Sequence, residues 1–430
     1  MPERMGTNPR RRRRRIPRMP KSAAHRLAEF AERVLGGPLP VAVRTWDGRR
    51  AGPPGPTVVL KNRRALRWLL YSPGELGLAR AYVSGDLDVE GDLTEGFRRA
   101  WAYRPQLSAR DFGEAIRLAA RLGVFGLPPK PPAEEARLRG KPHTLDRDRS
   151  AISHHYDLSN AFYQLLMDDS MAYSSGYWSG TADLARAQHD KLELICRKLG
   201  LRPGMRLLDV GCGWGSLLVH AAKHHGVEAV GVTISAEQAQ HGKTRLAQHD
   251  LDDRVEVRRQ DYRELAGESF DAVASVEMGE HVGEDNYPVY ASTLFRMLKP
   301  TGRLLLQQMS RGAVAPGGGA FIERYIAPDM TMRPLSRTLG HLETAGFEIR
   351  DVHALREHYV PTVRAWADTL EQHWDEAVAL IGEAGARIWR LYLVGGALAF
   401  EENRMGVDQI LAVRPDADGR SGMPWTREWA

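Results

Sequence analysis

The sequence predicts a doubly wound, mostly parallel α/β sheet joined to a smaller N-terminal α+β unit. From Met205 onward, short apolar runs alternate with helical patterns, which is typical of a parallel sheet with helical connections. The prolines in residues 128–143 exclude regular structure and indicate a linker. With 430 residues, the chain is long enough for two domains with substantial cores.

The first 21 residues are strongly basic. They hold nine Lys or Arg residues against one acid, Glu3, and so contribute +8 to a formal net charge of +6, leaving −2 for the rest. Because the arginine run Arg10–Arg15 cannot pack, we expect a disordered tail attracted to polyanions. Nucleic acid and an anionic membrane both fit, and each basic residue near such a membrane contributes about 1 kcal/mol. The alternatives are a solvated leader or a protein that starts at Met19.

The sequence pattern of residues 22–127 predicts the smaller α+β unit. Ser22–Leu35 has the apolar periodicity of an amphipathic helix. Short strands are expected at 41–44 and 57–60. Further helices are expected on both sides of Ser72–Gly74, through the nineties and at 110–122. No catalytic motif stands out in this unit.

Residues 144–415 predict the larger domain, followed by a C-terminal tail at 416–430. Its strands are expected at 205–210, 228–233, 254–259, 270–276, 302–309, 346–351 and 407–413. Its strongest helices are expected at 214–224, 235–249 and 286–298. Ligands of such sheets bind at the carboxyl ends of the strands, so that edge is where a site is expected.

Cysteine usage and hydropathy indicate a cytoplasmic protein. Cys196 and Cys212 have neither metal-ligand spacing nor a disulfide framework, which suggests a reducing compartment and no metal. The basic tail lacks the apolar stretch of a signal peptide. The longest apolar run, Leu391–Phe400, is shorter than the about 20 residues that span a bilayer. Contact with the inner face of the membrane is therefore expected to be peripheral.

The most informative motif is Leu207–Gly215. An apolar strand ends in Asp209 and is followed by the alternate glycines Gly211, Gly213 and Gly215, which let the backbone approach a ligand closely. An acid followed by tightly spaced glycines suits a ligand with an amino-acid end and a ribose, as in S-adenosylmethionine. The alternative is a glycine turn without a ligand.

Polar residues also follow the second and third strands. Thr233 and Gln238 stand where many nucleotide-binding folds hold the ribose, and Ser235 is a plausible helix cap as the structural alternative. Asp261 supplies an acid for an adenine amino group, with the ring of Tyr262 beside it. The candidate cofactor contacts at these two strand ends are Thr233, Ile234, Gln238, Asp261 and Tyr262.

Three titratable residues, Glu277, Glu280 and His281, follow the fourth strand. Such clusters are places where pKa values are tuned for proton transfer, although a solvated loop is the alternative. Upstream, the segments around Tyr156, Tyr173 and Ser174 are rich in aromatic and hydroxyl groups. They fit either a core or a lid over a reactive cation.

Six segments together resemble the cyclopropane fatty acid synthase family, which includes the mycolic acid cyclopropane synthases. They are His155–Leu158, Tyr173–Trp178, the glycine loop, Val232–Ser235, Gln260–Arg263 and Glu280–Gly283. The resemblance covers about residues 144–415. It implies a Rossmann-like methyltransferase fold, with Tyr156, Tyr173 and Ser174 at the cofactor. It also implies methylation, through a carbocation, of a cis double bond in an acyl chain, commonly in a membrane phospholipid.

The chain departs from the ring-forming members at three positions. Ser175 replaces a cysteine and Gln307 a histidine of a set that surrounds a bound bicarbonate, while Glu280 and Tyr359 match the family. Glu277 stands where ring-formers usually have glycine. A carboxylate there repels bicarbonate, whose presence is therefore doubtful, and could itself serve as the base.

A displaced base predicts a different product. After a hydride shift, proton loss from the new methyl group gives a methylene branch, the precursor of 10-methyl chains such as 10-methylstearate, which a separate reductase would complete. Ring closure on the same substrate is the alternative. A nucleic-acid methyltransferase lacks support because no Asn- or Asp-Pro-Pro-aromatic turn follows the fourth strand, and a non-enzymatic membrane-binding protein is a remote alternative. Acyl length, head group and oligomeric state, a homodimer included, stay open.

Overall fold

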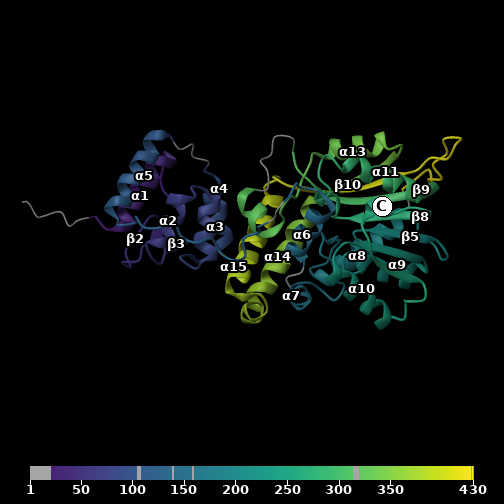
Figure 1. Ribbon diagram of the computed structural model, residues 1–430, viewed down its shortest axis with the longest axis horizontal. Coiled ribbons are helices and arrows are strands. Elements are labelled where there is room, and N and C mark those ends of the chain that lie inside the picture. Colours follow the sequence, from purple (N-terminus) through teal and green to yellow (C-terminus); the bar gives the residue numbers. More distant parts are fainter. Residues whose placement is uncertain are drawn as a thin grey trace, which may run out of the picture.

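The computed structural model describes residues 21–103, 108–137, 140–156, 159–312, 319–427 and 429, without the side chains of 152–156. Figure 1 shows a small N-terminal unit, two long helices in the middle, and a large sheet flanked by helices. The basic segment predicted as a tail lies outside the described residues except for Lys21. Among the described residues, no helix has the length and apolar character needed to cross a bilayer.

The N-terminal unit is a four-stranded sheet, ordered β2-β1-β3-β4, with helices against it. Its elements are α1 (Ala23–Leu35), β1 (Ala42–Arg44), β2 (Arg50–Ala51), β3 (Thr57–Leu60), α2 (Arg64–Tyr71), α3 (Glu75–Val83), β4 (Leu87–Glu90), α4 (Leu93–Trp101) and α5 (Ala109–Arg121). The predicted helices and two strands are confirmed. The short strands β2 and β4 escaped prediction because two to four residues carry little alternation.

The second sheet has seven strands in the order β10-β11-β9-β8-β5-β6-β7. Its strands are β5 (Arg206–Val210), β6 (Glu228–Thr233), β7 (Val255–Arg259), β8 (Phe270–Val276), β9 (Leu298–Ser310), β10 (Glu348–Ala354) and β11 (Gly406–Val413). Neighbours from β7 to β9 pair in parallel, whereas β11 is antiparallel to both β9 and β10. The predicted α/β class and its seven strands are confirmed.

The helices of this region connect and cover the sheet. They are α6 (Leu145–Tyr156), α7 (Asn160–Leu166), α8 (Leu184–Leu199), α9 (Ser216–His225), α10 (Ala236–Gln248), α11 (Tyr287–Met297), α12 (Gly319–Phe321), α13 (Leu335–Thr344), α14 (Arg356–Gln372) and α15 (Trp374–Glu401), with short turns η1 (Tyr262–Glu264), η2 (Gly279–His281) and η3 (Ile322–Ile326). Leu391–Phe400 forms the end of α15.

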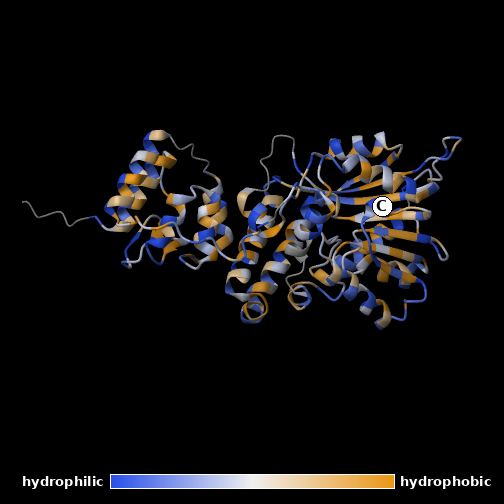
Figure 2. Ribbon diagram, viewed as in Figure 1, coloured by the Kyte–Doolittle hydropathy of each residue, from blue (hydrophilic) through white to orange (hydrophobic). Residues whose placement is uncertain are grey.

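Both faces of the large sheet are buried. Leu207 packs with α8, α9 and α10, while the next residue, Leu208, packs on the opposite face with α11 and α13. Successive residues of a strand point to opposite faces, so a strand covered on both sides must be apolar throughout. Figure 2 shows this concentration of hydrophobic residues in the central strands. The helices thus hold the carboxyl ends of β5, β6 and β8 in fixed positions.

The predicted linker and C-terminal tail both pack onto the folded body. Glu135, in the linker, is buried and pairs with Arg80 of α3 at 2.7 Å. Trp429, in the tail, is buried against Leu194 and Leu411. The N-terminal unit also shares a core with the larger one, because Ala79 and Val83 of α3 pack with residues of η3 and α15. The domain boundaries drawn from the sequence remain a proposal.

Candidate active site

The glycine loop closes one wall of a pocket at the carboxyl end of β5. Gly211 has a φ of 82° and donates its N–H to the Val232 carbonyl at 2.9 Å. A Cβ on Gly211 would lie 2.6 Å from Cγ of Met278, so a side chain is excluded there by the protein itself. Gly213 has a φ of 53°, and a Cβ there would meet no described atom within 4 Å. Gly213 therefore leaves open space beside the backbone, as a close ligand requires.

Gly215 has another role than the predicted ligand contact. It does not line the pocket but forms the N-cap of α9 with a φ of 84°. The expectation that all three glycines face the ligand is therefore wrong for Gly215. Its left-handed backbone starts the helix, which is a conformation that glycine adopts without steric cost.

Asp209 lies at the base of the loop, buried and facing the pocket. Its Oδ1 has no hydrogen-bond partner among the described residues, which is costly for a buried carboxylate oxygen. Burial raises the pKa of Asp209 to about 7, and the neighbouring ammonium of Lys191 opposes that rise. A ligand that donates a hydrogen bond here would satisfy the free oxygen.

Lys191 of α8 was not identified from the sequence. Its Nζ donates to Oγ of Ser174 at 2.9 Å, and Gln188, one turn earlier, donates to the Ser174 carbonyl at 2.8 Å. Burial lowers the pKa of Lys191 to about 8. The signal for it in the sequence was two polar residues, Gln188 and Lys191, three positions apart on the side of the helix that carries the core residues Leu192 and Ile195.

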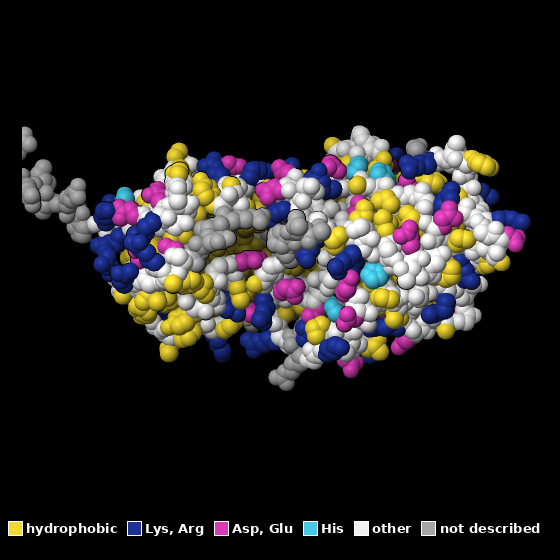
Figure 3. Space-filling view, turned by 90° about the horizontal axis from the view of Figure 1, so that it is seen from above, with side chains coloured by type: hydrophobic (Ala, Val, Ile, Leu, Met, Phe, Trp, Pro, Cys, Tyr) yellow, Lys and Arg dark blue, Asp and Glu magenta, His cyan; other side chains and the backbone are white. Residues whose placement is uncertain are grey.

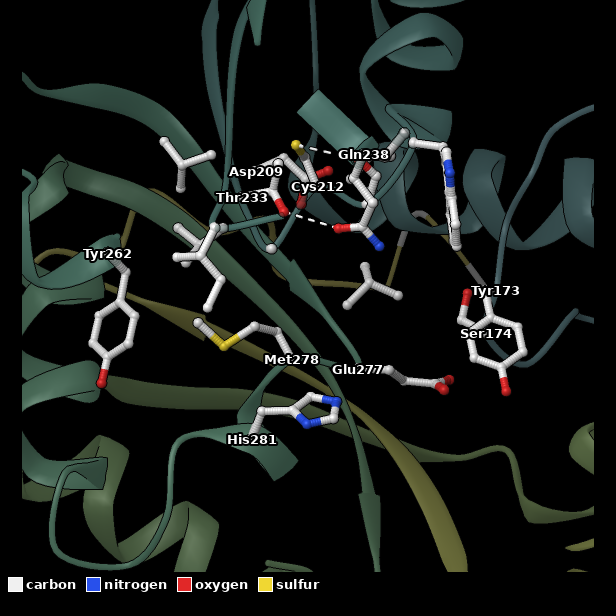
Figure 4. Close-up of a pocket in the computed structure, with 18 of the residues that line it drawn as sticks. Tyr173, Ser174, Asp209, Cys212, Thr233, Gln238, Tyr262, Glu277, Met278 and His281 are labelled. Atoms are coloured by element: carbon white, nitrogen blue, oxygen red, sulfur yellow. Dashed lines mark hydrogen bonds between the residues drawn. The ribbon is translucent and has the colours of Figure 1, made fainter. Parts of the chain in front are cut away.

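The opposite end of the pocket is formed by the strand ends of β6 and β7. Thr233 donates to Oε1 of Gln238 at 2.8 Å, and both residues line the pocket as candidate cofactor contacts, while Ser235 caps α10. Asp261 accepts hydrogen bonds from Arg263, whose side chain it holds. Ile234 and Tyr262 also line the pocket. In Figure 4, Tyr262 lies at one end, and Glu277, Tyr173 and Ser174 lie at the other.

Glu277 is held by three donors from distant parts of the chain. Its Oε1 accepts from the Ser175 backbone N–H at 3.0 Å and from Nε2 of Gln307 at 2.8 Å. Its Oε2 accepts from the Tyr359 hydroxyl at 2.5 Å. We refer to Ser175, Gln307 and Tyr359 around this carboxylate as the Glu277 cage. Burial raises the pKa of Glu277, and the three donors oppose that rise.

The backbone of Glu277 is unusual as well. Its φ is 51°, in the left-handed region where a non-glycine residue costs about 1–2 kcal/mol. The family resemblance implies a glycine at this position, and that glycine would adopt this φ freely. Retention of a strained backbone at a pocket is typical of functional positions. The strained backbone and the three donors thus point to a functional role for this carboxylate.

The two other titratable residues after β8 differ in position. His281 lines the pocket, and burial lowers its pKa to about 4, so its imidazole is neutral at pH 7. Glu280 is fully buried away from the pocket, where its carboxylate accepts from the Met309 N–H. Burial, then the nearby charge of Glu277, raises the pKa of Glu280 to about 8. Glu280 is thus largely protonated at neutral pH.

The predicted catalytic residues are therefore split between the pocket wall and a layer behind it. Glu277 and His281 line the pocket, whereas Ser175, Gln307, Tyr359 and Glu280 do not. Of the three titratable residues expected together after the fourth strand, Glu280 therefore turns inward instead of facing the pocket. Tyr173 lines the pocket and its hydroxyl donates to that of Tyr392 at 3.2 Å. The side chain of Tyr156 lies outside the described residues.

The pocket fits S-adenosylmethionine. The unpartnered Asp209 oxygen offers an acceptor in the middle, Gly213 leaves room beside the loop, and Tyr262 supplies an aromatic ring at one end. An adenosine at the Tyr262 end would place the methionine part near Asp209 and Lys191. When bound, this co-substrate supplies an electrophilic methyl group. At the end of the pocket opposite Tyr262, the residues are Glu277, Tyr173 and Ser174, as Figure 4 shows.

Comparison with known proteins agrees with this assignment. Residues 143–410 match the family model described as mycolic acid cyclopropane synthetase. The chain is 39% identical to the "Probable fatty acid methyltransferase Rv3720" of Mycobacterium tuberculosis, covering 91% of this chain and 95% of that one. It is 36% identical to the cyclopropane-fatty-acyl-phospholipid synthase of Escherichia coli, covering 62% of this chain and 68% of that one.

A solved structure shows the same fold with a bound product of methyl transfer. The mycolic acid cyclopropane synthase CmaA1, complexed with SAH and CTAB, is 29% identical and superimposes with a TM-score of 0.59, covering 61% of this chain and 97% of that one. The chain therefore belongs to the mycolic acid cyclopropane synthetase family, and it is an S-adenosylmethionine-dependent methyltransferase.

Proposed function

We propose that the protein methylates a cis double bond of an unsaturated acyl chain in a membrane phospholipid and leaves a methylene branch, with Glu277 as the base. Relatives named for fatty acids and fatty-acyl phospholipids support the acyl substrate. The single observation that carries the product is the Glu277 cage. Of the four positions that surround bicarbonate in ring-forming relatives, as the resemblance implies, three donate here to a carboxylate of the chain itself: the Ser175 backbone and the side chains of Gln307 and Tyr359.

The cage explains why Glu277 can act without a bound anion. Three donors hold its carboxylate in one position, so an oxyanion from solution would meet both a filled site and a like charge. Glu280, with a pKa raised to about 8, adds a mostly neutral carboxyl behind it. The three donors favour the carboxylate form of Glu277, whereas Glu280 is mostly protonated, and two carboxyl groups in different environments are a recurrent way to divide acid and base roles. We therefore assign the proton acceptor to Glu277.

The proposed reaction converts the cis alkene to a methylene branch by methyl transfer, a hydride shift and loss of a proton. The π electrons of the alkene form a bond to the methyl group, whose bond to sulfur breaks, and the adjacent chain carbon becomes a cation. A hydride then moves from the methylated carbon to that cation, which transfers the positive charge to the methylated carbon. Glu277 takes a proton from the new methyl group, and the C–H electrons form the C=CH2 bond. The aromatic rings of Tyr173 and Trp366, 5.1 Å apart, lie beside this end of the pocket.

Positive charge on the protein surface supports a substrate that is part of a membrane phospholipid. Figure 3 shows Lys and Arg side chains gathered at the far end of the N-terminal unit. Each basic residue near an anionic bilayer contributes about 1 kcal/mol, so such a face favours peripheral binding. We propose that the protein works at the cytoplasmic face of the membrane and that a separate reductase converts the methylene branch to a methyl branch.

The proposed function is tested by identifying the acyl product that the enzyme forms. The full chain is expressed in a host that lacks its own ring-forming enzyme, oleate is fed, and the extracted acyl chains are examined by proton NMR. Mass does not suffice because the methylene and cyclopropane products are isomers. We expect exo-methylene proton signals that are absent in cells carrying the Gly211→Val variant. Cyclopropane signals instead would show that the altered site still closes a ring.

A further inference from the structure

A cluster of histidines lies between α8 and α9, on the helix layer that supports the glycine loop. His189 comes from α8, and His220 and His224 come from adjacent turns of α9. A ligand atom of each of these three imidazoles lies within 4.8 Å of the other two. Their ring centroids are 4.6–5.7 Å apart. Figure 1 shows both helices on the same face of the sheet.

The cluster has the further features of a metal site. Oε2 of Glu193, one turn after His189, lies 3.2 Å from Nε2 of His220. A carboxylate on one imidazole nitrogen fixes the ring and leaves the lone pair on the other, which is the usual support of a ligating histidine.

The exposed members can adjust to an ion. His189 and His224 lie at the surface while His220 is buried. Tetrahedral ligation at 2.0–2.1 Å requires nitrogens about 3.4 Å apart, which small rotations of the two exposed rings can reach. Cys196 and His225 also approach His220, but Cys196 is buried and has less freedom to move toward an ion than the exposed rings. The three imidazoles are therefore the better donor set.

We propose that His189, His220 and His224 bind a divalent transition-metal ion such as Zn²⁺. Three imidazoles suit this class of ion, whereas Mg²⁺ and Ca²⁺ prefer oxygen ligands. The bound ion would tie α8 to α9. Because α8 carries Lys191 and Gln188, which hold Ser174, and α9 starts at the glycine loop, this bridge would stabilise the supports of the cofactor pocket. The site is independent of the lipid product.

The test is direct metal binding to the untagged, chelator-treated full chain. Titration calorimetry with ZnCl₂ is expected to give one ion per chain, with no comparable binding of MgCl₂. His189→Gln and His224→Gln, both at exposed positions, should each weaken Zn²⁺ binding at least about tenfold. His373→Gln is the matched control, since His373 is exposed in the turn between α14 and α15 and should leave binding unchanged.

Thermal unfolding supplies the second measurement. An ion that binds only the folded chain raises the midpoint, so Zn²⁺ should stabilise the wild type and the His373→Gln variant but not the two cluster variants. Zn²⁺ affinity that is equal in the wild type and both cluster variants would overturn the proposal. So would equal loss in the His373→Gln variant, because binding would then be a general property of surface histidines.

Discussion

The cofactor side of the pocket and the Glu277 cage are built in different ways. The cofactor side consists of short turns at the ends of β5, β6 and β7, in which consecutive residues make the surface. The cage draws Ser175 from the loop before α8, Gln307 from β9 and Tyr359 from α14 onto one carboxylate. A local turn can be read from a motif, whereas convergence of this kind depends on the complete fold.

This difference separates binding from product choice. Changes in the glycine loop should affect cofactor affinity, because that backbone forms the cofactor wall. Changes in the cage should leave affinity nearly intact and alter the chemistry that follows methyl transfer. The variants below test this separation from the largest expected effect to the smallest.

Glu277→Gln should have the largest effect on the chemical step. The amide is nearly isosteric but cannot accept a proton, and loss of a general base typically costs about 10²–10⁴-fold in rate. S-adenosylmethionine affinity, measured by calorimetry, should stay within about threefold because the cofactor side is untouched. The matched control is Glu343→Gln on the exposed surface of α13. Full turnover by Glu277→Gln would remove this residue from the mechanism.

Gly211→Val should abolish detectable cofactor binding. The reason lies in the loop itself rather than in the space of the ligand. A side chain would collide with Met278 at a φ of 82°, so the loop itself must shift. Gly213→Ala sharpens the comparison, since a Cβ there meets no described atom. It should keep the fold and still weaken binding. Unchanged affinity in both variants would contradict the placement of the cofactor.

Tyr359→Phe should have an intermediate effect. The Tyr359 hydroxyl lowers the pKa of Glu277 by donating to its carboxylate, against the rise caused by burial. Without this donor the pKa of Glu277 rises further, and the acid limb of the kcat/KM profile should move to higher pH. We expect a rate loss of about tenfold at pH 7. A profile that does not move would show that the titrating group is not Glu277.

Glu280→Gln should have the smallest effect, on stability and its pH dependence. Because the folded pKa of Glu280 is about 8 and its ordinary value is 4.5, the folded chain holds a proton that the unfolded chain has lost in this window. The stability from this group is complete below pH 4.5 and is lost as pH rises through 8. Thermal midpoints should therefore fall less steeply with pH in the variant. Identical slopes would show that Glu280 ionises normally.

The parts of the site that could be predicted follow this same division. Asp209, Gly211, Gly213 and Thr233 follow directly from strand ends and a glycine turn, and all four line the pocket. Lys191 does not follow from such a turn, since a lysine on a helix is ordinarily solvated and the pattern of polar residues on an apolar helix face is a weaker signal. The inward turn of Glu280 likewise depends on contacts with β9.

The fold shows the same pattern. The central strands were predictable because burial on both faces makes them nearly continuous apolar runs, and the edge strands β7 and β10 because they follow the same alternation of strand and helix. By contrast, α14 and α15 were not anticipated, although they supply Tyr359 and the aromatic packing beside Glu277. Trp366, Trp389 and Phe400 in these helices signal a core without indicating which one. Aromatic residues fill a helical core and a lipid pocket equally well.

The central claim is that a carboxylate of the chain takes the position of a bicarbonate ion. The most direct test is to follow the product of the purified enzyme by proton NMR in buffer depleted of bicarbonate and again after bicarbonate is added. We predict exo-methylene signals at the same rate in both conditions. Activity that requires bicarbonate, with cyclopropane signals in the product, would contradict the claim.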